Sequence, residues 1–242
     1  MARILSFVFL AFALAALGCA NTTPISFDTT PTPAPTPRLS VVKPATAPPR
    51  TTYKTYASRD VTVRRRSEWA NAAPITSRLD PMGTPMCITV HHEGDVASPM
   101  SASGVCAHLR AVRASQIRPK GSGGLGAGDI AYHFIVDPSG DVWEGRPICY
   151  QGAHAGNFDA NQRNIGICLL GNFSIQYVSA AQKQSLQKLL VTLMNRYNLS
   201  PNQVYTHREI KRRFGLPATE CPGTHLQADM DEMRVKLRYA NR

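Results

Sequence analysis

Short apolar runs along the chain predict a set of buried strands. Cys87–His91 is an uninterrupted apolar and β-branched segment, and Asn164–Leu170 has the same character. Ile130–Val136 predicts a further strand, and Val142–Glu144 begins another. Asp137–Gly140 lies between these two and has the composition of a turn.

Other segments repeat their apolar residues at helical spacing. Ser101–Ser115 is one, and Ser179–Tyr197 carries the strongest apolar stripe, which consists of Leu186, Leu189, Leu190, Leu193 and Tyr197. Ser179 is a candidate N-cap for this helix, and Asn198 is a candidate end.

A last helix is expected over Gln227–Tyr239. Strands interleaved with helices are typical of an α/β fold. We therefore predict a mixed central β-sheet flanked by helices, in a single domain that spans residues 61–242.

The first sixty residues have a different character. Arg3 precedes the uncharged apolar run Ile4–Leu17, which is short for a membrane span and typical of a secretory signal. The following Gly18-Cys19 resembles the end of a bacterial lipobox, so we predict a signal peptide at 1–18 and a lipid anchor on Cys19. A simple signal peptide with an unmodified Cys19 is the alternative. By the same resemblance, Ala20 favours the periplasmic face of the outer membrane.

Residues 19–60 are rich in Thr, Pro and Ala, and we predict a disordered tether to the membrane. A featureless tail is the alternative reading of the same composition.

The formal charge of the 242-residue chain is +11, and this favours a polyanionic partner. Gly121–Gly126 fits the pattern G-x-G-x-x-G, but it precedes a strand instead of following one, which argues against a dinucleotide site. Export argues against nucleic acid, whereas a cell wall with free carboxylates suits a basic surface. We expect a monomer.

A candidate metal site comes from His91, at the end of a buried strand, and from His207 and Cys221 near the C-terminus. Two His and one Cys give zinc three protein ligands and leave a fourth position for water, as in catalytic zinc sites. Taken alone, the pattern also fits a surface His207 and a Cys221 that belongs to a disulfide.

The surrounding residues resemble the family of peptidoglycan recognition proteins and type 2 N-acetylmuramoyl-L-alanine amidases. Five ordered blocks carry the resemblance: Arg66–Ala70, Ile88–His92, Asp129–Gly140 with Trp143–Arg146, Gly152–Gly156 with Asn164–Phe173, and Thr206–Arg208 with Thr219–Gly223.

The resemblance implies a peptidoglycan-recognition-protein-like amidase fold, with His91, His207 and Cys221 as Zn²⁺ ligands and Tyr132 and Thr219 as catalytic residues. It implies hydrolysis of the amide between the lactyl group of N-acetylmuramic acid and L-alanine in peptidoglycan. Members without the ligand Cys typically bind without hydrolysis, so Cys221 favours an enzyme over a non-catalytic receptor or anchor. Another amide, such as that of a soluble muropeptide, stays open as the substrate.

Further residues near these blocks have weaker claims to a role. His154 and Asn157 are candidate substrate contacts. His92 and His133 alternate with better candidates and are expected to face the other side of their strands. We expect surface positions for His108 and His225. Glu93 is expected to be a solvated loop residue, with a role as base as the alternative. Any pairing among Cys87, Cys106, Cys149 and Cys168 stays open.

The segment Lys211–Leu216 lengthens the last block beyond the family pattern, and a longer loop beside the site is expected there.

Overall fold

The computed structural model describes residues 61–239 of the chain. The signal peptide predicted at 1–18, the lipid anchor at Cys19 and the tether at 19–60 lie outside the described residues, so these three assignments stay predictions. Within residues 61–239, no helix combines the length and the apolar character that a membrane crossing requires.

Six strands form one sheet in the order β1-β4-β3-β5-β2-β6. Their bounds are Val63–Arg64 (β1), Cys87–His92 (β2), Phe134–Val136 (β3), Val142–Glu144 (β4), Asn164–Leu169 (β5) and Val204–Thr206 (β6). Only β3 and β4 pair antiparallel, and every other neighbouring pair is parallel. The predicted mixed α/β sheet is confirmed.

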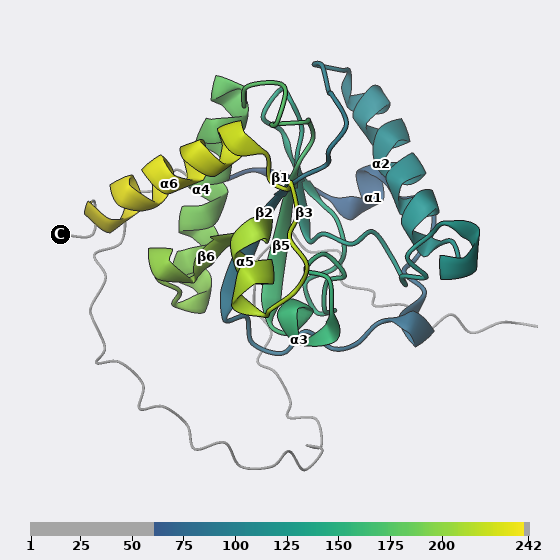
Figure 1. Ribbon diagram of the computed structural model, residues 1–242. Coiled ribbons are helices and arrows are strands. Elements are labelled where there is room, and N and C mark those ends of the chain that lie inside the picture. The colour runs from purple at the N-terminus through teal and green to yellow at the C-terminus, as the bar shows by residue number, and fades with distance from the viewer. Residues whose placement is uncertain (1–60, 240–242) are drawn as a thin grey trace, which may run out of the picture. The chain divides into compact units, whose positions relative to one another are not determined.

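Helices cover both faces of the sheet, with α4 and α6 on one face and α1 and α2 on the other (Figure 1). The α-helices are Arg66–Trp69 (α1), Ala102–Ile117 (α2), Phe158–Asn161 (α3), Ala180–Tyr197 (α4), His207–Arg213 (α5) and Thr224–Tyr239 (α6). Short 3₁₀ turns lie at Thr76–Arg78, Lys120–Ser122 and Pro201–Gln203.

The main core lies between the sheet and helices α4 and α6. The apolar runs of β2 and β5 supply fully buried side chains to it, and the leucine stripe of α4 packs against them. Ile88 and Val90 of β2 belong to this core. Because side chains alternate along a strand, Thr89 and His91 project from the opposite face of the sheet.

The predicted ends of α4 are confirmed. The Ser179 side chain accepts a hydrogen bond from the backbone N–H of Gln182, and the Gln182 side-chain oxygen accepts one from the backbone N–H of Ser179. Asn198 ends the helix in the left-handed conformation at φ 53°. The last helix, α6, begins at Thr224, three residues earlier than the sequence predicted.

The strand predicted over Ile130–Val136 is shorter, since only Phe134–Val136 forms β3. Side chains add to the backbone hydrogen bonds of the segment just before β3, in which the Arg146 N–H donates to the Tyr132 carbonyl at 2.8 Å. The Gln116 side chain accepts the Ala131 N–H at 2.7 Å, and the Arg146 guanidinium donates to the Ile130 carbonyl at 2.8 Å. This irregular segment contains Tyr132, so side chains of α2 and of the β4 end hold the residue in place.

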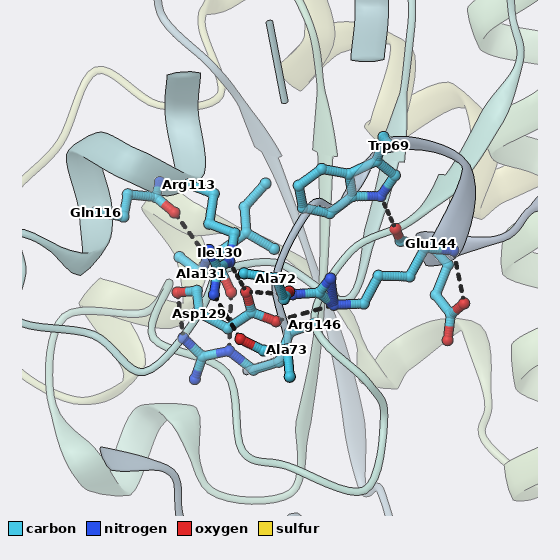
Figure 2. Close-up of polar contacts among 11 residues, drawn as sticks. Trp69, Ala72, Ala73, Arg113, Gln116, Asp129, Ile130, Ala131, Glu144 and Arg146 are labelled. Atoms are coloured by element: carbon cyan, nitrogen blue, oxygen red, sulfur yellow. Dashed lines mark hydrogen bonds and ion pairs between the residues drawn. The ribbon is translucent and has the colours of Figure 1, made fainter. Parts of the chain in front are cut away.

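A buried charge cluster anchors the same segment, as Figure 2 shows. The Asp129 carboxylate is fully buried and accepts from Arg66 at 2.8 Å and from Arg113 at 2.5 Å. Arg66 starts α1 and Arg113 lies in α2, so one carboxylate joins both helices to the segment before β3. Arg146 adds a hydrogen bond to the Asp129 carbonyl at 2.9 Å.

We predict that Asp129→Ala lowers the free energy of unfolding by about 3–5 kcal/mol, because two buried arginines lose their counter-charge. Asp141→Ala is the matched control. It breaks a pair with Arg64 in which the two side chains are 50% and 36% exposed, and it should cost at most about 1 kcal/mol. Urea unfolding of both variants checks this, and equal losses would contradict the anchoring role of Asp129.

Candidate metal centre

Parallel pairing of β2 with β6 brings two of the candidate ligands together. Val90 of β2 stands opposite Thr206 of β6, so the next residues, His91 in β2 and His207 just after β6, lie side by side at the carboxyl ends of the two strands. Thr206 also caps α5: its hydroxyl accepts the Glu209 N–H, and the Glu209 carboxylate accepts the Thr206 N–H. His207 is therefore fixed as the first residue of α5.

The segment after α5 returns to the same edge and adds Cys221. The His92 backbone N–H donates to the Cys221 sulfur at 3.4 Å. The Cys221 N–H donates to the Thr219 hydroxyl at 3.2 Å, and Arg208 donates to the Glu220 carbonyl at 3.1 Å. One ligand atom from each of His91, His207 and Cys221 lies within 4.8 Å of the others.

A chain of hydrogen bonds behind His91 determines which of its ring nitrogens faces the other ligands. The Asn164 carbonyl can only accept, so His154 donates to it through Nε2 at 3.1 Å. His154 Nδ1 then accepts from His91 Nε2 at 3.0 Å. The lone pair of His91 is left on Nδ1, which lies 3.7 Å from the Cys221 sulfur. A donor relay of this kind orients metal-binding histidines.

Glycine makes room for that relay. A Cβ atom on Gly166 of β5 would lie 2.4 Å from the His154 ring, and a Cβ on Gly152 would lie equally close. Any larger residue at either position would displace His154 from its place behind His91.

The donor set fits a zinc ion. Zinc binds histidine nitrogen at about 2.1 Å and thiolate sulfur at about 2.3 Å, which in a tetrahedron puts the two atoms about 3.6 Å apart. The sulfur of Cys221 and Nδ1 of His91 are 3.7 Å apart. His207 Nε2 is buried and meets no hydrogen-bond partner among the described residues, as a nitrogen reserved for a metal would be.

Burial keeps the two imidazoles neutral, which is the form that binds metal. It lowers the pKa of His91 well below the usual value, and His154 and His207 add to the effect. Burial, followed by the charge of Lys211, lowers the pKa of His207 to about 4. Burial also raises the pKa of the Cys221 thiol to about 12, while the His92 N–H, Arg208 and Lys211 oppose the rise.

Tyr132 and Thr219 lie beside the three ligands. The Tyr132 ring is centred 5.2 Å from that of His91. Burial raises the pKa of Tyr132 well above its usual value, with Cys168, Cys221 and Glu93 adding to the rise, so the hydroxyl keeps its proton for donation. The Thr219 hydroxyl accepts the Cys221 N–H and retains its own proton to donate.

The structure favours supporting positions for the two candidate substrate contacts. His154 is buried, and both of its ring nitrogens have partners. Asn157 is exposed, and its side chain caps α3 by accepting the Ala160 N–H at 2.8 Å. Their contact with substrate stays a prediction.

Other expectations near the site have clear outcomes. His92 and His133 accept hydrogen bonds from the backbone N–H groups of Phe173 and Gly166, so both rings have partners outside the ligand group. The solvated loop position expected for Glu93 was wrong, because its side chain is only 12% exposed and pairs with His108 at 2.6 Å. Cys87, Cys106 and Cys168 are free thiols in the structure.

The prediction of a long loop at Lys211–Leu216 was partly wrong, because α5 continues through Arg213 and only the remaining residues form a loop.

His91 and His154 are 63 positions apart, so no local spacing in the sequence indicates their contact. The pairing of Glu93 with His108 likewise depends on the packing of α2 against the end of β2.

Comparison with known proteins identifies the family. The family model described as N-acetylmuramoyl-L-alanine amidase matches residues 81–224, which is more than half of the chain. The chain belongs to this family. The match contains His91, Tyr132, His207, Thr219 and Cys221.

Relatives and solved structures agree with this membership. Peptidoglycan-recognition protein SC2 of Drosophila simulans is 30% identical over 168 residues, which cover 69% of this chain and 83% of that protein. The structure of N-acetylmuramoyl-L-alanine amidase LysC from Clostridium intestinale is 28% identical, with a TM-score of 0.53, over 73% of this chain and 97% of that one. Drosophila PGRP-LB, 22% identical with a TM-score of 0.59 over 70% and 92% of the two chains, shares the fold.

Proposed function

We propose that this chain is a zinc-dependent amidase that hydrolyses the bond between the lactyl group of N-acetylmuramic acid and L-alanine in peptidoglycan. The observation that carries the proposal is the meeting of His91, His207 and Cys221 at one sheet edge, with Tyr132 against His91. Membership of the amidase family supports the substrate class.

An amide carbonyl is a weak electrophile, and water is a weak nucleophile. A zinc ion held by His91, His207 and Cys221 would supply Lewis acidity to the carbonyl and activate water near neutral pH. The chain's own residues contribute the rest. In the proposed reaction the protonated Tyr132 and Thr219 hydroxyls would donate hydrogen bonds to negative charge that develops on the carbonyl oxygen. His154 holds the His91 ring and its tautomer throughout.

A non-catalytic receptor is the second candidate, and it is favoured by the similarity to a peptidoglycan-recognition protein. A receptor needs a surface that fits the muropeptide, but it has no need of three converging metal-binding side chains. The position of the Cys221 sulfur, 3.7 Å from His91 Nδ1, therefore supports the enzyme.

We expect the purified, zinc-loaded protein to release new L-alanine amino termini from peptidoglycan, because the scissile amide yields a free peptide amine. Mass spectrometry of the products measures them. Chelation should abolish the release, and added Zn²⁺ should restore it. Cys221→Ala should remove activity while leaving the folded circular dichroism spectrum in place. Wall binding without new termini would support the receptor instead.

We expect His154→Ala to weaken zinc binding about 10- to 100-fold, because His91 loses the partner that fixes its tautomer and orientation. Competition with a chromogenic chelator measures the affinity. His225→Ala is the matched control, since His225 lies against Tyr177 with ring centroids 4.0 Å apart and contacts none of the three ligands. Unchanged affinity in a folded His154→Ala protein would argue against the relay.

We also propose that the enzyme is exported and held at the periplasmic face of the outer membrane by lipid on Cys19. This proposal rests on the sequence of residues 1–60. Cys19→Ala should shift the protein from the membrane to the soluble fraction, and a mature N-terminal peptide that carries no acyl mass would contradict the anchor.

A further inference from the structure

Lys211 is a cation beside the metal centre that the proposed chemistry does not use. It follows His207 by four positions in α5, so both side chains project from the same face of the helix. The side chain is half-buried. Within residues 61–239, no carboxylate forms an ion pair with it.

Packing fixes where Lys211 lies. Ile210, its neighbour in α5, is buried in a small cluster with Ala155 and Ala160. The Lys211 Cε atom comes within 4.0 Å of the point that a Cβ on Gly156 would occupy. Lys211 therefore lies between α5 and the turn that follows His154, at the rim of the ligand group. Its charge contributes to lowering the pKa of His207 and opposes the burial-driven rise in the pKa of Cys221.

The charges of α5 leave this rim positive. Glu209 is the only acidic residue of the helix, and it is engaged by Arg234 at 2.6 Å and by Gln227 at 3.0 Å. Arg213 lies on another face of the helix, over the Tyr205 ring at 5.7 Å. Arg208 also acts on Cys221, but it donates to the Glu220 carbonyl at 3.1 Å. Lys211 has no acidic partner among the ion pairs of residues 61–239, and such a group attracts an anion.

We propose that Lys211 is a specificity-determining residue that binds a free carboxylate of the acidic stem peptide next to the scissile amide. The inference rests on the proposed function. In peptidoglycan the residue after L-alanine is a γ-linked D-glutamate, whose α-carboxylate is either free or amidated. A free carboxylate makes a charge-assisted hydrogen bond with an ammonium group, whereas a carboxamide makes only a neutral one.

The test compares two synthetic muropeptides that differ only in whether this carboxylate is free or amidated. For Lys211→Met, we expect KM for the free acid to rise about 10- to 100-fold, since a hydrogen bond to a charged group is lost. The kcat for this substrate should stay within about twofold of the wild-type value, because the hydrogen bond from Lys211 to the carboxylate is present in both the bound substrate and the transition state. KM for the amidated substrate should stay unchanged, and Lys211→Arg should keep most of the preference.

Arg213→Met is the matched control, because it removes the same charge from the same helix on a face away from the ligands. It should leave both KM values unchanged. Equal rises in KM for both substrates would overturn the proposal. So would a loss of kcat at constant KM, which would make Lys211 a stabiliser of the oxyanion. If Arg213→Met raised KM for the free acid as much as Lys211→Met does, the preference for the free acid would come from the overall charge of the protein, and the proposal would fail.

Calorimetric titration of each intact muropeptide into the zinc-loaded protein separates this inference from the proposed function. If the wild-type chain hydrolyses neither muropeptide, the amidase proposal fails, but the titration still tests Lys211. Tighter binding of the free acid by the wild-type protein, lost in Lys211→Met, supports the carboxylate contact. Equal binding of both muropeptides by the wild-type protein overturns it.

Discussion

The parallel pairing of β2 with β6 is the constraint on which the candidate metal centre depends. The register that sets Val90 opposite Thr206 places His91 and His207 side by side at the carboxyl ends of the two strands. If β2 shifted by one residue relative to its neighbours, His91 would point into the core under α4, and Ile88 and Val90 would point to the opposite face of the sheet. The burial of those two apolar side chains therefore holds the candidate ligands in place.

Asp129 has a comparable role for the catalytic candidate Tyr132. Its segment is irregular, so strand pairing alone would leave Tyr132 loosely held. Two arginines from α1 and α2 bind the Asp129 carboxylate, and Arg146 binds nearby carbonyl groups. A buried charge with several partners gives such a segment one preferred arrangement, because any shift would leave a charge unpaired in the interior. The position of Tyr132 beside His91 thus depends on side chains from three other elements.

Local patterns in the sequence predicted the elements that local residues determine. The apolar runs of β2 and β5 and the capped helix α4 were confirmed within a residue or so, because burial and capping act over a few positions. The family resemblance supplied the ligand set. Sequence reasoning missed the His91–His154 relay, the Glu93–His108 pair and the irregular approach to Tyr132, because each depends on partners from distant segments. It also missed both β6, which is three residues long, and α5, which is seven residues long and capped by Thr206, the last residue of β6.

Cys221 lies three residues before α6, whose side chains Leu226, Met230 and Leu237 are buried in the main core. Undocking of α6 would carry the sulfur away from His91 and His207, so local opening and metal release would be one event. Bound metal would then slow amide hydrogen exchange in α6 and shield it from proteases, since a ligand held only by the closed form stabilises that form. Metal supply would in this way control how long the C-terminal helix stays folded, as well as the chemistry at the sheet edge.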